Sequence, residues 1–223
     1  MQTGKAQQTA AKRAQGARKR TRLAPADRRA QLLGCAIAAF AERGLSRAAH
    51  ADVARRAGVA VSSVFHYFPT REALVGAVLD EVERHFLKMS DDALGGNADP
   101  VAGMALHAKM FADEVKSDSD YVKLWIDWSA SIREEIWPRY LKFYEQQRDH
   151  ALDAVRKGQE MGYFDTSLSA EDLATAYVGC GHFMVNLAHT PGKSIEDVYA
   201  FIDRIGQAVF EGARREGARK PRK

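Results

Sequence analysis

Hydrogen-bonding side chains gather in the segment "GVAVSSVFHYFPTREAL", residues 58–74, between a glycine and a proline that interrupt helices. They are Ser62, Ser63, His66 and Tyr67. Hydroxyl and imidazole groups both donate and accept hydrogen bonds, so they suit the base edges and phosphate oxygens of a nucleic acid. The segment therefore indicates recognition by hydrogen bonding.

A short helix would present these groups on one side. Val64 and Phe68 lie four residues apart and share the face turned to the core, which leaves the polar side chains outward. Pro69 ends the helix, and Thr70 is a suitable N-cap for the next one. The pattern predicts a helix of barely two turns that begins at Val61.

Two further helices are expected before this one. The first is indicated by apolar residues at helical spacing between Pro25 and Gly44, and the second covers residues 51–57 and ends at Gly58. His50 is expected to pack against these helices. Two short helices joined by a tight glycine turn form a helix-turn-helix, whose second helix enters the major groove of DNA.

The charge of the chain is strongly asymmetric. The net charge is +4, but residues 1–69 hold 13 basic and 3 acidic residues, whereas residues 70–210 hold 14 basic and 24 acidic ones. A cationic module joined to an anionic one predicts that the first binds a polyanion. Double-stranded DNA is the leading candidate for that partner.

Residues 1–22 are basic, lack acidic residues and contain few large apolar ones, so a flexible arm is expected there. It could serve only as a solubilising tail, but Arg20 and Arg22 adjoin the predicted head, which favours contact with the minor groove. Phosphate contacts are expected from Lys19, Arg47, Tyr67 and Arg71. His66 is left with three alternatives: a base, a phosphate or a neighbouring side chain.

After residue 70 the sequence predicts helices almost to the end of the chain. It lacks the alternation of polar and apolar residues that is typical of strands. A long helix is expected from about residue 133 to 161, and the capping-box pairs Ser169 with Asp172 and Ser194 with Asp197 open two more. The fold class is all-α. The expected divisions are a basic arm (1–22), a helix-turn-helix domain (23–70), a helical regulatory and dimerisation domain (71–214) and a basic tail (215–223).

Aromatic residues in this second region allow two interpretations. Aromatic side chains at helical spacing usually form a core. The alternative is a ligand pocket, for which Met89, Met104 and Trp125 would supply apolar walls, and Asp127 and Glu135 polar groups. A small-molecule effector is a possible partner on the second interpretation.

The last two predicted helices are too apolar for a single buried face, so a homodimer interface is expected there. The residues assigned to it are Tyr177, Phe183, Met184, Leu187, Val198, Ile202, Ile205 and Val209.

Other classes of function find little support in the sequence. No nucleophile elbow, phosphate loop or zinc-protease motif is present, so no catalytic residue, metal or cofactor is expected. Cys35 and Cys180 lack the paired spacing of a metal or redox site, which predicts a reduced, cytoplasmic setting. The longest uncharged run, residues 173–189, is too short to span a bilayer, so no membrane segment is expected.

The run "AIAAFAERGLSRAAHADVARRAGVAVSSVFHYFPTREALVGAVLDEV" resembles the N-terminal domain of the TetR family of bacterial transcriptional regulators. The segments "VKLWIDWSASIREEIWP" and "SAEDLA" are similar to the branch of quorum-sensing regulators that includes LuxR, HapR and SmcR. The resemblance runs from about Arg18 to about Phe210. It implies a helical homodimer of about nine helices per subunit that binds specific DNA sequences.

The resemblance assigns the recognition helix to Val61–Tyr67 and minor-groove contacts to Arg20 and Arg22. Ala60 stands where the family usually has a serine N-cap, and His66 where this branch typically has asparagine. Because asparagine forms a bidentate bond to adenine that histidine cannot reproduce, operator preference is expected to differ.

The resemblance also implies a cavity lined by Phe86, Met89, Trp125, Tyr140 and Tyr144. The leading hypothesis is a quorum-sensing-like global regulator. The alternatives are a repressor released by an unidentified small apolar ligand and, from another class, an architectural protein that binds DNA without sequence preference.

Overall fold

The computed structural model describes residues 23–217, and the side chains through Gly206. Nine α-helices and one π-helical segment account for its regular structure, and no strand occurs within that range. The all-α prediction is therefore confirmed.

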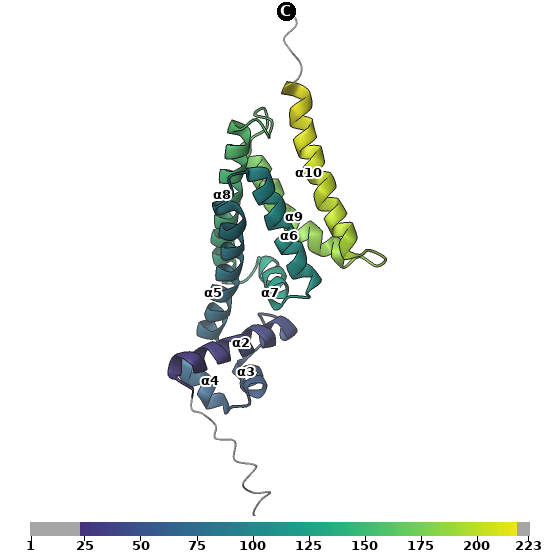
Figure 1. Cartoon of the computed structure of the whole chain (residues 1–223). Helices are drawn as coiled ribbons and strands as arrows, with labels where there is room; N and C mark the ends of the chain where they lie inside the picture. The colour runs from purple at the N-terminus through teal and green to yellow at the C-terminus, as the bar shows by residue number, and fades with distance from the viewer. Residues whose placement is uncertain (1–22, 218–223) are drawn as a thin grey trace, which may run out of the picture.

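Three helices form the head at one end of the molecule (Figure 1). They are α2 (Pro25–Arg43), α3 (His50–Ala57) and α4 (Val61–Tyr67). Gly58 ends α3 with a left-handed backbone (φ 65°), which a glycine adopts without steric cost and which turns the chain into α4. The side chains of Phe40, Val53, Val64 and Phe68 are almost completely buried between the three helices.

Helix α5 (Arg71–Ser90) leaves the head and runs far into the body (Figure 1). Its start follows the capping prediction, because the Thr70 hydroxyl accepts a hydrogen bond from the Ala73 N–H at 3.1 Å. A π-helical turn, η1 (Asp91–Gly95), follows it directly.

Five helices complete the body: α6 (Pro100–Lys116), α7 (Asp120–Ser129), α8 (Trp137–Glu160), α9 (Ala170–Ala188) and α10 (Ile195–Gly217). Helix α8 lies beside α5 and α9, while α10 contacts α6 and α9 and leans away from α8 (Figure 1). Both predicted capping pairs are present, at 3.2 Å from the Asp172 N–H to the Ser169 hydroxyl and 2.8 Å from the Ser194 N–H to the Asp197 carboxylate. No helix among the described residues is long and apolar enough to cross a membrane.

One helix boundary was predicted wrongly. The helix expected from about residue 133 begins only at Trp137, and turns occupy residues 132–136. Pro138 explains the difference, because a proline lacks the N–H needed inside a helix and clashes with the preceding turn, so it is tolerated only in the first turn. The Trp128 indole N–H donates to the Ile136 carbonyl at 3.1 Å and holds these turns against α7.

Candidate DNA-binding face and ligand cavity

Helix α4 turns its two sides to different surroundings, as its spacing predicts. Val64 and Phe68 are 0% and 1% exposed. Ser62 and His66 are exposed and Ser63 and Tyr67 half-buried on the outer side. At the start of the helix Val61 is 40% exposed, and Ala60 caps it without a side-chain hydrogen bond. The outer face thus keeps its polar groups available to another molecule.

His50 fixes the position of α4 against α3. Its imidazole stacks on the Phe65 ring with 3.9 Å between centroids, and its Nε2 lies 2.7 Å from the Phe68 carbonyl oxygen. The side chain is only 5% exposed, which agrees with the expectation that it packs within the head. Because the carbonyl can only accept, Nε2 carries the proton and donates. His50 therefore positions α4. Its Nε2 is already hydrogen-bonded and is not available to DNA.

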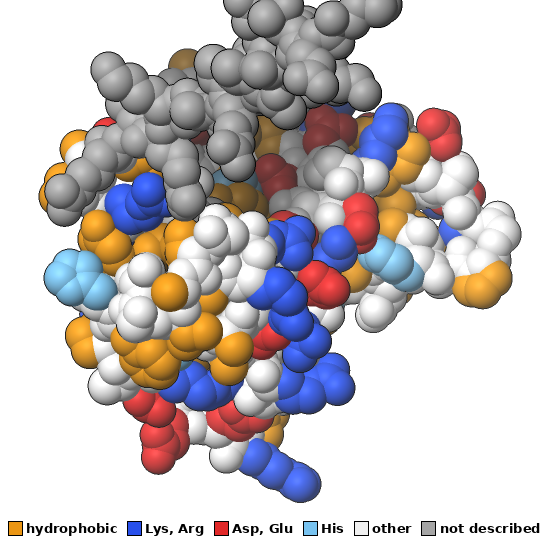
Figure 2. Space-filling view, turned by 90° about the horizontal axis from the view of Figure 1, so that it is seen from below, with side chains coloured by type: hydrophobic (Ala, Val, Ile, Leu, Met, Phe, Trp, Pro, Cys, Tyr) orange, Lys and Arg blue, Asp and Glu red, His pale blue; other side chains and the backbone are white. Residues whose placement is uncertain are grey.

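Arginine side chains surround the outer end of the head. Figure 2 views the molecule from that end and shows Lys and Arg side chains gathered in a band beside a hydrophobic patch. Arg56 pairs with Glu42 at 3.0 Å, and Arg43 pairs with Asp52 at 3.2 Å. Arg47 is exposed, and its Nε donates to the Arg43 carbonyl at 3.1 Å.

The other residues predicted to contact phosphate differ in where they lie. Arg71 is half-buried, and its guanidinium donates to the Leu45 carbonyl, so part of it ties α5 to the loop between α2 and α3. Lys19, Arg20 and Arg22 lie outside the described residues.

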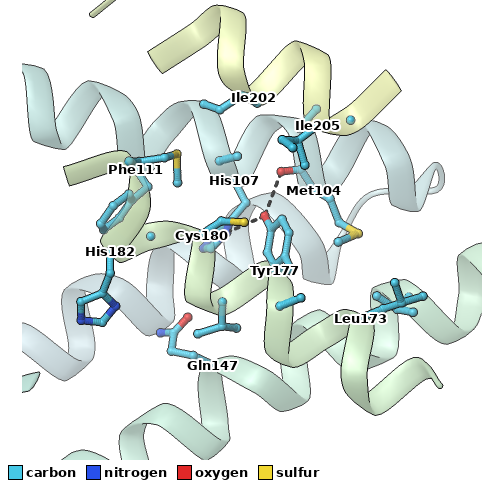
Figure 3. A pocket seen from close by; sticks show the side chains of 18 of the residues that line it. Met104, His107, Phe111, Gln147, Leu173, Tyr177, Cys180, His182, Ile202 and Ile205 are labelled. Carbon is cyan, nitrogen blue, oxygen red and sulfur yellow. Dashed lines mark hydrogen bonds between the residues drawn. The ribbon is translucent and has the colours of Figure 1, made fainter. Parts of the chain in front are cut away.

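A cavity of about 390 Å³ opens among the body helices (Figure 3). Its size is within the range of small-molecule sites. Five of the residues predicted for a pocket line it: Phe86, Met104, Trp125, Tyr140 and Tyr144. Most other lining side chains are also apolar, including Phe111, Phe143, Leu173 and Ile202. The cluster of aromatic residues therefore forms both a core and the wall of a cavity.

Three residues predicted for the pocket lie elsewhere. Met89 is buried in the core. Asp127 follows Trp125 by two residues, so its side chain lies about 200° further around α7 than that of Trp125 and faces away from the cavity. Its carboxylate accepts a hydrogen bond from the Leu45 N–H at 2.5 Å. Glu135 is exposed in the turn before α8, because the helix expected to carry it begins later. The structure thus brings neither carboxylate into the cavity.

Polar groups in the cavity wall come from residues that the sequence did not single out for it. The Tyr177 hydroxyl lies 2.9 Å from both the Met104 carbonyl and His107 Nδ1. His107 Nε2 lies 3.0 Å from the Ser90 hydroxyl, whose oxygen is also 2.6 Å from the side-chain amide of Gln147. Figure 3 shows His107, Gln147 and Tyr177 around the same space. His107 could have been suspected, because it follows Met104 by three residues on the apolar stripe of α6.

Burial keeps these groups uncharged. It lowers the pKa of His107 to about 4, with a smaller contribution from His150, and it also lowers the pKa of His182. The same cause raises the pKa of the Cys180 thiol and raises that of Tyr140 to about 12. None of the four groups carries a charge near pH 7.

The residues predicted for a dimer interface divide into two groups. Met184 and Val198 are buried within the subunit, and Tyr177 lines the cavity with its hydroxyl bonded to α6. They were misassigned, because α9 and α10 each bury one side against their own subunit. Phe183 and Ile205 remain 52% and 42% exposed. Leu187 and Ile202 are half-buried, and the side chain of Val209 lies outside the described ones.

A helix-turn-helix head with an open recognition face, joined to a helical body, defines a DNA-binding transcriptional regulator. Residues 32–78 match the family described as bacterial regulatory proteins, tetR family. The chain is 41% identical over 191 residues to the HTH-type transcriptional regulator LuxR of Vibrio harveyi, an alignment that covers 84% of this chain and 93% of the relative. The chain belongs to the tetR family.

Solved structures share the fold of this chain. The ketosteroid transcriptional regulator KstR2 of Mycobacterium tuberculosis superposes with a TM-score of 0.63 at 22% identity, covering 83% of this chain and 94% of that one. FadR of Bacillus subtilis, solved in complex with stearoyl-CoA, gives 0.67 at 16% identity, covering 82% and 97%. At these identities the likeness concerns the fold alone.

Proposed function

We propose that the protein is a sequence-specific regulator that binds DNA as a homodimer. In this proposal α4 of each subunit enters one of two successive major grooves of a roughly palindromic operator. The outer face of α4 is the observation that carries the proposal: His50, Val64 and Phe68 hold the helix from inside while its polar side chains stay open.

The proposal gives the polar residues different roles. Ser62, Ser63 and His66 would contact base edges beside the Val61 side chain, and Tyr67 would contact phosphate. A second set would contribute salt-dependent affinity and minor-groove contacts: Lys19, Arg20, Arg22, Arg47 and Arg71. Because Arg71 already donates to the Leu45 carbonyl, we expect it to contribute less than Arg47.

Selection of binding sites from random DNA with the purified chain tests the proposal. A regulator of this kind should enrich a palindrome with half-sites about one helical turn apart. Replacing Ser63 or His66 with alanine should then change the preferred base pairs and cost about 1–3 kcal/mol of discrimination at those positions. Equal affinity for random and selected DNA would instead identify an architectural protein.

The cavity favours a second element of the proposal, control by a small molecule. Its apolar wall with a few convergent polar groups is the usual form of a ligand site. Two proteins of the same fold are a ketosteroid transcriptional regulator and a regulator solved in complex with stearoyl-CoA, which supports an effector with a large apolar part here. A quorum-sensing-like global role is supported by the likeness to LuxR. Comparing transcripts of the wild-type and deletion strains at low and high cell density tests that role.

A further inference from the structure

Two large apolar side chains are exposed on the outer face of α4. Val61 is 40% exposed and Phe65 is 46% exposed, and Leu23, at 39%, is the other exposed large apolar side chain in the described part of the head. A single exposed apolar residue is common on protein surfaces. Val61 and Phe65 are four residues apart, however, so they lie on the same side of the helix and form one apolar stripe.

The Phe65 ring is held in a fixed orientation. One of its faces stacks on the His50 imidazole, with 3.9 Å between centroids and 6° between the ring planes. His50 is itself anchored, because its Nε2 donates to the Phe68 carbonyl at 2.7 Å. A side chain that is already ordered loses little conformational entropy when it binds a partner. The stack therefore prepares the open part of the Phe65 ring for contact.

A polar stripe lies beside the apolar one. Ser62 and His66 are both exposed, and each follows a member of the apolar pair by one residue, which places it about 100° further around α4. The same end of the molecule carries a band of Lys and Arg side chains next to hydrophobic ones (Figure 2). This face therefore suits a polyanion that offers an apolar group beside hydrogen-bonding groups.

Thymine has this combination in the major groove of DNA. It carries a C5-methyl group next to its O4 acceptor, and the paired adenine adds the N6 donor and the N7 acceptor. A G·C pair presents hydrogen-bonding groups but no methyl group. The two stripes of α4 therefore match a T·A pair better than a G·C pair.

We propose that Val61 and Phe65 make α4 select thymine by its C5-methyl group, while Ser62 and His66 hydrogen-bond to the polar base edges beside it. The proposal rests on DNA recognition by α4 and specifies part of the recognised sequence, namely thymines at fixed positions of each half-site. It also adds Phe65 to the residues that determine specificity.

Deoxyuridine tests the proposal without altering the protein, because it differs from thymidine only by the missing methyl group. The operator enriched from random DNA is synthesised with each thymine replaced in turn, at the same position of both half-sites. Affinity is measured by fluorescence anisotropy at one salt concentration. Loss of one buried methyl group should weaken binding about fourfold, so replacement in both half-sites should cost about 15-fold at one or two positions. Equal affinity for all these operators would overturn the proposal.

Two protein variants identify the residues that sense the methyl group. Val61→Ala and Phe65→Ala should each lose most of the discrimination between thymine and uracil at one of the sensitive positions. Leu141→Ala removes a comparably exposed apolar residue (43%) on α8 and should keep full discrimination. A variant that binds both operators more weakly but still discriminates between them would show that its residue only positions α4. Circular dichroism melting verifies that the variants fold, and the deoxyuridine series gives its answer with the unaltered chain.

The outcome can be separated from that of the proposed function. An operator that is enriched but tolerates deoxyuridine at every position would leave sequence-specific regulation intact and exclude the methyl contact. If no sequence is enriched, DNA recognition itself fails, and the methyl contact fails with it.

Discussion

His107, which is half-buried in the cavity wall, links the cavity to the stability of the fold. Its folded-state pKa of about 4 lies below the ordinary value of 6.5, so the unfolded chain binds the proton more readily than the folded one. The stability that this group preserves above pH 6.5 is lost as the pH falls toward 4.

We expect the free energy of unfolding to fall by about 2 kcal/mol between pH 7 and pH 5 on account of His107 alone. Urea titrations at both pH values measure this change. His107→Gln should remove most of it, whereas replacing the exposed His189 with glutamine should not. An equal pH dependence in wild type and His107→Gln would show that the imidazole is not what couples the fold to acid.

At the scale of the element, α4 lacks one common stabilising feature. Ala60 has the extended backbone of an N-cap (φ −67°, ψ 147°) but no side chain that can accept from the first turn. Because its side chain is exposed, Ala60→Ser adds a hydroxyl without crowding. We expect about 1 kcal/mol of additional stability in urea denaturation. An unchanged urea midpoint would mean that water already caps this helix equally well.

Helix α7 joins the cavity to the head. Trp125 lines the cavity, and two residues later Asp127 accepts from the Leu45 N–H in the loop between α2 and α3. Asp127→Ala should cost about 1–3 kcal/mol of stability by leaving this donor unpaired, and it should weaken any effect of a ligand on operator affinity. Asp127→Asn retains an acceptor and should be milder. If ligand and operator remain coupled as strongly in Asp127→Ala as in wild type, α7 does not carry the coupling through this contact.

These elements also show what the sequence could predict. The two faces of α4 followed from a spacing of four residues within one helix, and the capping pairs from a spacing of three. The contact of Asp127 with Leu45 joins residues 82 positions apart, so no local pattern contains it. Likewise, Tyr177 and Phe183 lie on one apolar helix, but only packing against α6 shows that Tyr177 points into the subunit while Phe183 remains exposed.

At the scale of the whole molecule, the exposed apolar side chains of α9 and α10 need a partner. Phe183 is 52% exposed, stacks on Phe201 of α10 with 4.7 Å between centroids, and lies on the same pair of helices as the exposed Ile205. A second copy of the chain is the partner that our proposal requires, because a two-fold axis relates the two recognition helices to the two half-sites.

Phe183→Glu would place a charge in that interface. We expect a monomer in analytical ultracentrifugation and a loss of operator affinity of at least about 100-fold. In a dimer, binding of one head raises the effective concentration of the second head at the other half-site, and a monomer lacks this gain. Leu141→Glu is the matched control, since Leu141 is a comparably exposed residue (43%) on α8. It should stay dimeric and bind the operator normally. A Phe183→Glu protein that remains a dimer would place the two-fold contact elsewhere, whereas a folded monomer that keeps full operator affinity would show that recognition does not depend on pairing.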